Sequence, residues 1–496
     1  MKKSYQHFQL STFFTVCCLS VALSVTGACS EKSASEEEPA GQPPKTEVTA
    51  AATAEQNLLR AMLIADSAVA AHFTGSDMAM ARFYNPYTKE RSGEKGSIWM
   101  YTASIEAVNA ILHALAAVKD RGKPELYNAH FDRYAELLAK LYENAEYYMG
   151  TFTLVSYTQT KTWSVYGVDR GSYKGGARVE GIYNVYDDQQ WLIRELLESY
   201  KITGESDYLE MAEYLAEYVL DGWDCTRTSN GEEVGGIPWG PGYVTKHSCS
   251  NGPMVSPLVW LHELYKDKDD EIAHRDVDPA DKKTRRVQQE KKSDYYLDFA
   301  KKIYAWQKRY LLRPDGVYDD MMGGCTPGNI SLEVVDLVLY RKGASCKDRV
   351  GPAITYNSGT MLSGAVDLYR ATGDNAYLAD AKKLSDASFG YFATLNATRT
   401  GYYTYDISGF RNWFNGVLMR GYAEAYPVYG SVAVPLKSFQ DNLDYAYKNS
   451  FYKGFLPTNL LLGWSVRKDN NDVEGMFTFA FAAEYAVLAK YEAGKF

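Results

Sequence analysis

Hydrophobic positions recur with the period of an α-helix from about residue 54 to the end of the chain. In one segment Ile193, Leu196, Leu197 and Tyr200 fall at i, i+3, i+4 and i+7, with charged residues on the opposite face. No long alternating pattern typical of strands interrupts these segments. The pattern predicts twelve helices, at residues 54–72, 97–119, 128–148, 187–203, 206–221, 251–266, 293–309, 355–372, 375–393, 407–427, 436–449 and 474–493.

Two regions of the sequence depart from this helical pattern. Residues 151–155 are β-prone and predict a short strand within the loop 151–184. Residues 266–294 carry nine basic and nine acidic residues, a composition that predicts a solvated loop inserted between two helices.

An internal repeat supports a fold built from helical hairpins. The matching stretches are residues 200–215 and 369–384. In the two copies Gly204 and Gly373 are placed to end one helix, and Ser206 or Asp374 to help start the next.

The even-numbered helices, counted from the N-terminus, begin with unusual chemistry, and the odd-numbered helices do not. Their first residues are Trp99-Met100-Tyr101, Asp187-Asp188, Ser250-Asn251-Gly252, Tyr356-Asn357-Ser358-Gly359, Arg411-Asn412-Trp413-Phe414-Asn415 and Glu474-Gly475-Met476-Phe477. If even helices form an inner ring and odd helices an outer ring, all six starts meet at one rim. Such a rim suits an uncharged, polyhydroxylated ligand, because amides satisfy hydroxyl groups and rings cover the apolar faces of sugars.

Asp187 and Asp188 are the candidate catalytic residues. They lie in the first turn of a helix, where unpaired N–H groups and the helix dipole stabilise negative charge. Two carboxylates this close cannot both ionise freely, so one should stay ionised while the other keeps its proton. That difference suits a retaining glycosidase, whose nucleophile and acid lie about 5 Å apart. The structural alternative is that the pair merely caps the helix.

The tetrapeptide Val-Tyr-Asp-Asp occurs a second time, ending in Asp319 and Asp320. Here Met321-Met322-Gly323-Gly324 follows, and the glycines indicate a loop instead of a helix. The second pair is therefore a candidate for lining a sugar site and not for catalysis.

Further candidates for substrate contacts come from the helix starts and from the motif at Trp239. The full set is Trp99, Tyr101, Gln190, Trp191, Trp239, Asn251, Asp319, Asp320, Tyr356, Asn357, Trp413 and Asn415. Each has an alternative interpretation, because tryptophans are often core residues and Asn or Ser often cap helices.

Composition narrows the possible partners. The chain has 62 acidic and 53 basic residues and no basic stripe, which argues against nucleic acid. Its 41 tyrosines and 9 tryptophans weakly favour carbohydrate. The histidines lack zinc-site spacing, and residues 469–474 lack the spacing of a calcium-binding EF-hand, so no metal site is expected. We expect a monomer.

The N-terminus is typical of a bacterial lipoprotein. Lys2 and Lys3 precede an apolar run, and Thr26-Gly27-Ala28-Cys29 resembles a lipoprotein cleavage site. This predicts a signal peptide at 1–28 and lipidation of Cys29, although an ordinary secretory peptide is the alternative.

The predicted lipid anchor sets the expected location of the protein. Residues 29–53 are expected to form a disordered tether, followed by a single domain at 54–496. The acidic tether is similar to the export signals of Bacteroides-type surface lipoproteins. We therefore expect an outer-membrane lipoprotein at the cell surface, with the periplasmic face as the alternative, that contacts the membrane only through its lipid.

Four cysteines follow Cys29, and an even number in an oxidising compartment permits disulfides. Pairing Cys225 with Cys249 and Cys325 with Cys346 closes the shortest loops. The sequence leaves open whether either pair forms.

The ordered motifs of the chain resemble those of glycoside hydrolase family 76, the endo-α-1,6-mannanases, over roughly residues 60 to 493. They are Tyr186-Asp187-Asp188 with Gln190 and Trp191, Gly235-Gly236-Ile237-Pro238-Trp239, Ser250-Asn251-Gly252, and Thr355-Tyr356-Asn357-Ser358-Gly359.

This resemblance implies an all-α fold, an (α/α)6 barrel with its active site on the rim. It implies hydrolysis of the α-1,6-linked backbone of fungal mannan with retention, Asp187 as nucleophile, Asp188 as general acid/base, and no cofactor. The sequence departs from the family pattern in the 266–294 insertion and in Lys246-His247-Ser248-Cys249, which bears on subsite preference.

Two competing functions remain open at this point. One is an (α/α)6 glycosidase of different specificity, such as an unsaturated uronyl hydrolase, although Arg411 is the only basic residue among the even helix starts. The other is a glycan-binding surface lipoprotein, which has no need of two adjacent acids.

Overall fold

The computed structural model describes residues 50–495 except 325–327, 329, 345 and 347. The predicted signal peptide, the lipidation of Cys29, and Cys325 lie outside the described residues. The predicted tether also lies outside them, except for its last four residues. These belong to the first helix, which begins at Ala50 and not at residue 54.

All twelve predicted helices are present among the described residues. They are α1 (Ala50–His72), α2 (Ile98–Asp120), α3 (Glu125–Ala145), α4 (Tyr186–Thr203), α5 (Ser206–Asp221), α6 (Gly252–Tyr265), α7 (Lys292–Leu311), α8 (Thr355–Thr372), α9 (Asn375–Phe392), α10 (Arg411–Ala425), α11 (Ala433–Ser450) and α12 (Gly475–Ala493).

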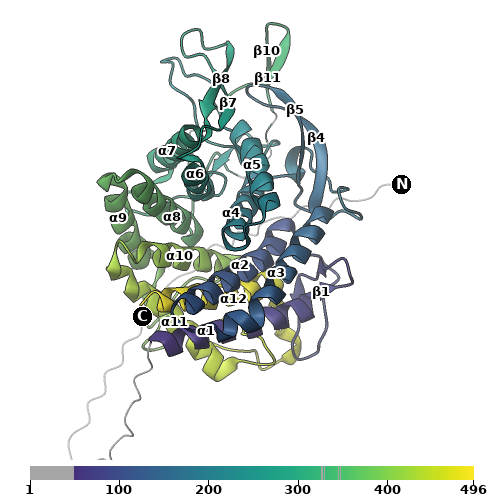
Figure 1. Cartoon of the computed structure of the whole chain (residues 1–496), viewed down its shortest axis with the longest axis vertical. Helices are drawn as coiled ribbons and strands as arrows, with labels where there is room; N and C mark the ends of the chain where they lie inside the picture. Colours follow the sequence, from purple (N-terminus) through teal and green to yellow (C-terminus); the bar gives the residue numbers. More distant parts are fainter. Residues whose placement is uncertain (1–49, 325–327, 329, 345, 347, 496) are drawn as a thin grey trace, which may run out of the picture. The chain divides into compact units, whose positions relative to one another are not determined.

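The even-numbered helices form a closed inner ring. Each of α2, α4, α6, α8 and α10 packs against the next even helix, and α12 packs against α2 to close the ring. The odd helices pack outside: α3 on α2, α5 on α4, α7 on α6, α9 on α8, α11 on α10, and α1 on α12 (Figure 1). The fold is an (α/α)6 barrel, as predicted.

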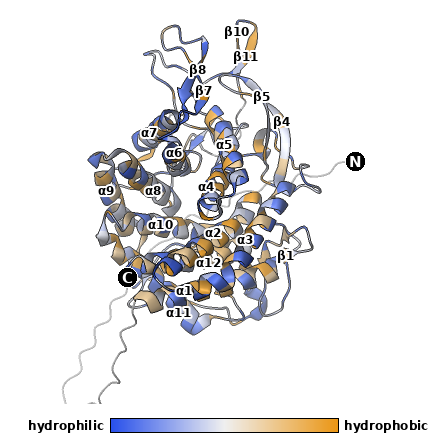
Figure 2. Ribbon diagram, viewed as in Figure 1, coloured by the Kyte–Doolittle hydropathy of each residue, from blue (hydrophilic) through white to orange (hydrophobic). Residues whose placement is uncertain are grey.

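Burial of the helices follows their position in the two rings. The inner helix α12 is apolar on all sides and almost wholly buried, whereas the outer helix α3 buries only a stripe that includes Leu138 and Leu141. Helix α2 is long and apolar enough to cross a membrane by length and composition alone. In the described structure its apolar stretch lies mostly inside the barrel (Figure 2).

The repeated hairpins end and begin as the sequence predicts, with one exception. Gly204 and Gly373 end α4 and α8 in the left-handed conformation, with φ of 77° and 70°. Asp374 accepts a hydrogen bond from the Ala376 N–H at the start of α9. Ser206 is the first residue of α5 and not its cap, which is Glu205.

Short antiparallel strands occupy the loops between helices. They are β1 (Phe73–Thr74) with β2 (Ala79–Met80), β3 (Phe83–Tyr84) with β15 (Val473–Glu474), β4 (Met149–Val155) with β5 (Thr160–Tyr166), β7 (Glu271–Val277) with β8 (Arg285–Lys291), β10 (Leu332–Val335) with β11 (Val338–Arg341), β13 (Thr394–Leu395) with β14 (Tyr403–Thr404), and the three-stranded sheet of β6 (Lys246–His247), β9 (Met321–Met322) and β12 (Arg349–Val350). The strand predicted at 151–155 is thus confirmed as part of β4.

The charged insertion at 266–294 is a β-hairpin, and its prediction as a loop was wrong. Asp276 and Arg286 are directly opposite each other on β7 and β8 and form an ion pair. His274 also contacts Glu290 across the strands, at 2.7 Å between Nδ1 and Oε2. Cross-strand pairs of opposite charge stabilise a hairpin. From the composition we expected these charged side chains only to be solvated, but they hold the two strands together.

Gly359 marks a close approach of α8 and α10. A Cβ at this position would lie 2.7 Å from the Val417 carbonyl oxygen and 2.8 Å from the backbone of Leu418. We therefore expect Gly359→Ala to lower the free energy of unfolding by about 1–3 kcal/mol, the usual cost of overpacking. Urea denaturation measures the change.

Gly390 in α9 is the matched control, because a Cβ there meets nothing within 4 Å. Gly390→Ala should leave stability unchanged or raise it by roughly 0.5–1 kcal/mol. Equal effects of the two substitutions would show that the contact between α8 and α10 does not constrain Gly359.

Candidate active site

Asp187 and Asp188 lie in the first turn of α4, at the rim of the barrel. The chain enters the helix through extended Val185, and the Tyr186 N–H donates to the Trp239 carbonyl at 2.8 Å. Asp188 is 7% exposed, whereas Asp187 is only half-buried. The Asp188 N–H donates to Asp187 Oδ1 at 3.0 Å, so the helix start itself contributes a donor to Asp187.

The two carboxyl groups have different surroundings. Burial raises the pKa of Asp187, and hydrogen bonds from the Cys249 thiol, the Trp239 indole and the Asp188 backbone oppose that rise. Burial also raises the pKa of Asp188 well above its usual range, and the negative charges of Asp187 and Asp169 raise it further. Donors stabilise the ionised form of Asp187, and repulsion favours the protonated form of Asp188.

The second Asp-Asp pair is divided between two roles. Burial raises the pKa of Asp320 to about 6. A hydrogen bond from Asn357 and the positive charge of Arg411 oppose this rise, and the negative charge of Asp187 adds to it. Asp320 therefore faces the same site as Asp187. Asp319 instead forms ion pairs with Arg313 and Arg349, at 3.2 and 3.1 Å.

The three-stranded sheet brings these loops together. Strand β9, which directly follows Asp320, pairs with β6 and β12. The Ser248 N–H, just after β6, donates to the Asp320 carbonyl at 2.8 Å. The loop before α6 and the loop before α8 therefore meet beside Asp187.

Trp239 and His247 form a stacked pair next to Asp187. Their ring centroids are 4.7 Å apart with an interplanar angle of 19°, and Trp239 Nε1 donates to Asp187 Oδ2 at 3.3 Å. Burial lowers the pKa of His247 to about 4, so the ring is neutral. Its Nε2 lies 3.0 Å from Thr245 Oγ1 and 3.1 Å from the Gly324 carbonyl.

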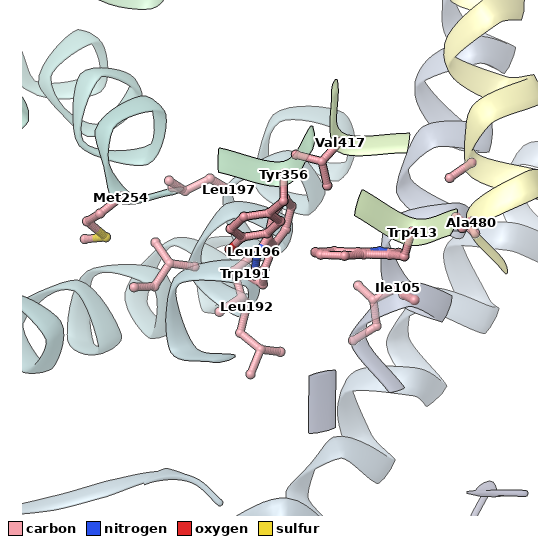
Figure 3. Packing of buried hydrophobic residues seen from close by; sticks show 14 of the residues in the cluster. Ile105, Trp191, Leu192, Leu196, Leu197, Met254, Tyr356, Trp413, Val417 and Ala480 are labelled. Atoms are coloured by element: carbon pink, nitrogen blue, oxygen red, sulfur yellow. Dashed lines mark hydrogen bonds between the residues drawn. The ribbon is translucent and has the colours of Figure 1, made fainter. Parts of the chain in front are cut away.

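An aromatic cluster lies among the starts of α2, α4, α8 and α10. Trp191 Nε1 donates to the Tyr356 hydroxyl at 2.7 Å, and Trp191 contacts Trp413 edge-to-face at 4.7 Å between centroids (Figure 3). Trp99 continues the cluster at 5.3 Å from Trp413. Trp191, Tyr356 and Trp413 are buried, and Trp99 is half-buried. The cluster therefore supports the rim from inside more than it offers ring faces on which a sugar could stack.

Four of the predicted substrate contacts are buried and hydrogen-bonded within the protein. Tyr101 donates to the Leu141 carbonyl, and Gln190 to the Ser250 carbonyl. Asn251 accepts from the Ile237 N–H at 2.8 Å and donates to the carbonyls of Ile237 and His247. Asn415 accepts from Thr355 and donates to the Asp406 carbonyl. These hydrogen bonds show that the four residues hold the rim together, and their contact with a ligand stays a prediction.

The remaining predicted contacts differ in exposure. Trp239 and Asp320 are half-buried beside Asp187, as described above. Asn357 is fully buried. Its Nδ2 donates to the Asp319 carbonyl at 3.3 Å, and its Oδ1 has no protein partner. Asn357 therefore supports the segment that carries Asp320.

Sequence reasoning did not select three residues of this site: Asp169, His247 and Cys249. His247 and Cys249 fall in the tetrapeptide 246–249. Its departure from the family pattern was the feature of the sequence that could have pointed to them. Asp169 follows β5, and nothing in its sequence context points to Asp188.

Of the two cysteine pairings suggested by loop length, that of Cys225 with Cys249 is absent. Cys225 is a buried free thiol, so it does not pair with Cys249. Cys346 donates to the Val244 carbonyl at 3.0 Å, and its suggested partner Cys325 is outside the described residues. Within the described ranges no group of three or more His, Cys, Asp or Glu side chains is arranged to hold a metal ion.

The chain belongs to glycosyl hydrolase family 76, whose model matches residues 101–269 and 284–490. The gap between the two matched segments, residues 270–283, covers β7 and most of the turn that leads to β8. Membership of this family supports glycoside hydrolase activity.

Solved structures show the same fold. One is a family 76 mannosidase from Bacteroides thetaiotaomicron, with 19% identity and a TM-score of 0.63 over 89% of this chain and 100% of that one. Another is an α-1,6-mannanase from Salegentibacter sp., with 19% identity and a TM-score of 0.54 over 88% of this chain and 99% of that one. That structure is an inactive variant with two consecutive aspartates replaced, in complex with α-1,6-mannotriose. A search of curated proteins found no match.

Proposed function

We propose that this protein is an endo-acting, retaining hydrolase of the α-1,6-linked backbone of fungal cell-wall mannan. The observation that carries the proposal is the pair of adjacent carboxyl groups at the rim of a family 76 barrel. Three donors stabilise the ionised form of Asp187, whereas burial and neighbouring negative charges raise the pKa of Asp188 and favour its protonated form. The inactive Salegentibacter variant, which lacks two consecutive aspartates, supports the same pair here.

The two groups divide the reaction between them. Ionised Asp187 attacks the anomeric carbon of a mannosyl unit while protonated Asp188 gives its proton to the departing glycosidic oxygen. The product of this step is a mannosyl ester of Asp187. Asp188, now ionised, takes a proton from water as that water attacks the anomeric carbon, and both side chains return to their starting states.

The surroundings of the pair suit a substrate without negative charge. Trp239 and the uncharged His247 border Asp187, the carboxyl groups of Asp169 and Asp320 lie near the pair, and Arg411 forms an ion pair with Asp406 at 3.3 Å. A uronic acid substrate calls for cationic side chains aimed at its carboxylate. Mannan, which carries no charge, does not.

The test is digestion of unbranched α-1,6-mannan by the full chain, followed by mass spectrometry of the products and by NMR of the first anomer released. We expect a ladder of manno-oligosaccharides whose new reducing ends are initially α, because two inversions restore the configuration. Initial release of the β anomer would contradict retention. Binding of mannan without any product would favour a glycan-capture protein, and activity confined to unsaturated uronyl oligosaccharides would favour the other enzyme class.

A further inference from the structure

A second cavity lies towards the end of the barrel opposite the catalytic rim. It has a volume of about 450 Å³ and is lined by the middle and later turns of the inner helices α2, α4, α10 and α12, and by Arg370 near the end of α8. Glu198 in its wall lies ten residues beyond Asp188 on α4, which is about 15 Å along the helix axis. Among the described residues, none that we placed beside the catalytic pair lines this cavity.

Small side chains leave this space open. Ala110 on α2 and Ala423 on α10 line the cavity, where larger residues would fill it. Tyr426 and Tyr491 contribute apolar surface, with ring centroids 4.8 Å apart in an edge-to-face contact. The volume falls in the range of small-molecule sites in proteins, roughly 300–1,000 Å³.

The charges in the wall of the cavity balance one another. The lining holds four glutamates, and also four arginine or lysine side chains, of which Arg370 and Lys490 are exposed at the opening. Most of the inner charged groups pair with each other: Glu106 with Arg420, Glu195 and Glu424 with Arg194, and Glu198 with His113. An anion in the cavity would meet the glutamates, and a cation would meet the two inner guanidinium groups, so the wall favours a ligand without net charge.

Two polar groups of the lining have unused hydrogen-bonding capacity. Glu424 Oε2 is buried and has no hydrogen-bond partner among the described residues. Lys490 is exposed and forms no ion pair with another residue of the described part of the chain. The carboxylate oxygen can only accept and the ammonium group can only donate, whereas a hydroxyl group does both. A ligand that carries several hydroxyl groups satisfies both side chains without bringing a charge.

We propose that this cavity is a second carbohydrate site, which binds a short neutral saccharide. Hydroxyl groups of the sugar donate to Glu424 and accept from Lys490, and Tyr426 and Tyr491 contact an apolar face of the sugar ring. The proposal goes beyond the proposed function, because none of these residues takes part in hydrolysis. It therefore stands or falls independently of whether the protein cleaves mannan.

The site is tested by hydrogen–deuterium exchange on the full-length Asp187→Asn/Asp188→Asn protein, with α-1,6-mannobiose as the probe. The sugar should slow exchange about threefold or more in peptides 420–427 and 487–494, because binding suppresses local opening. Ala423→Phe, which fills the cavity, should abolish this protection and leave any protection of residues 235–251 at the rim unchanged. Protection confined to the rim, or none at all, would overturn the proposal.

Glu424→Gln tests the acceptor while keeping the cavity open. In the same background this change should weaken protection of peptides 420–427 and 487–494, with the concentration of mannobiose for half-protection rising about tenfold, because a charged acceptor is lost. Glu492→Gln is the matched control. Glu492 also lies on α12, but it pairs with Lys495 at 2.7 Å and does not line the cavity. Equal half-protection concentrations for Glu424→Gln and its parent would contradict the site.

The class of ligand is tested with three sugars that share one ring and differ in charge. Mannose should protect the two peptides at lower concentration than either mannosamine, which is cationic, or mannuronic acid, which is anionic. The difference should be lost in the Ala423→Phe protein, in which the cavity is filled. Stronger protection of the same peptides by either charged sugar would refute a site for a neutral saccharide.

Discussion

Asp187→Asn and Asp188→Asn should each lower kcat on α-1,6-mannan by roughly 10³-fold or more. The reaction needs both residues at once, so removal of either one costs about as much activity as removal of both. Without the Asp187 carboxylate no glycosyl ester forms, and without Asp188 the glycosidic oxygen departs unprotonated. Initial rates of reducing-end release on purified, folded proteins measure both effects. Near wild-type turnover by either variant would refute the assignment.

A third Asp-Asp dipeptide, outside the site, provides the matched control for lost charge. Asp269 and Asp270 follow α6 on the surface, and Asp269 pairs with Lys291 far from the rim. Replacing both by asparagine should leave kcat within about twofold of wild type, because exposed ion pairs contribute little. A large loss in this control would mean that net charge, and not the α4 pair, governs activity.

Azide separates the two catalytic roles. In the Asp187 variant, azide can attack the anomeric carbon in place of the missing carboxylate and release a glycosyl azide of inverted configuration. The same product from the Asp188 variant, and not from the Asp187 variant, would exchange the two assignments.

The sequence predicted the helices because their physics is local. An amphipathic period of 3.6 residues requires only that one face be buried, and both Gly204 and Gly373 end helices for a backbone reason that does not depend on distant residues. The 266–294 hairpin could not be predicted in this way. Its strands are held together by pairs such as Asp276 with Arg286. These two residues become neighbours only when the chain folds back at the turn, so a pattern along the chain does not reveal them.

The site was predictable only in part, for a geometric reason. Each residue of a helix advances about 1.5 Å along the helix axis, so a helix that begins at a rim carries its later residues away from the ligand and into the barrel. Asp187 is half-buried at the site, while Gln190, three residues later, is fully buried against the next inner helix. His247 and Cys249 were missed because a two-residue strand, invisible in hydrophobic pattern, brings them there.

The strongest stability prediction concerns a buried ion pair inside the barrel. Glu106 on α2 and Arg420 on α10 form an ion pair at 5% and 8% exposure, and Glu106 also accepts from Trp413 Nε1 at 2.9 Å. Burial lowers the pKa of Arg420 to about 10, which shows how poorly this guanidinium is solvated. Removal of its carboxylate partner should therefore be costly.

We expect Glu106→Leu to lower the free energy of unfolding by about 3 kcal/mol, at the lower end of the range for a broken buried pair. The lower end applies because a cavity of about 450 Å³ borders both side chains and admits water to the guanidinium, and because the negative charge of Glu424 still acts on Arg420. Urea denaturation measures the loss. The exposed Lys437–Asp441 pair of α11 is the control, and Asp441→Asn should change stability by no more than about 0.5 kcal/mol.

The double variant Glu106→Leu/Arg420→Met decides whether the orphaned charge causes that loss. With both charges gone, most of the stability should return, because an apolar pair of similar volume replaces a buried ion pair at little cost. About 1 kcal/mol should stay lost, since the Trp413 indole still lacks its acceptor. A double variant no more stable than Glu106→Leu would instead assign the whole effect to Trp413 and to the aromatic cluster that it shares with Trp191.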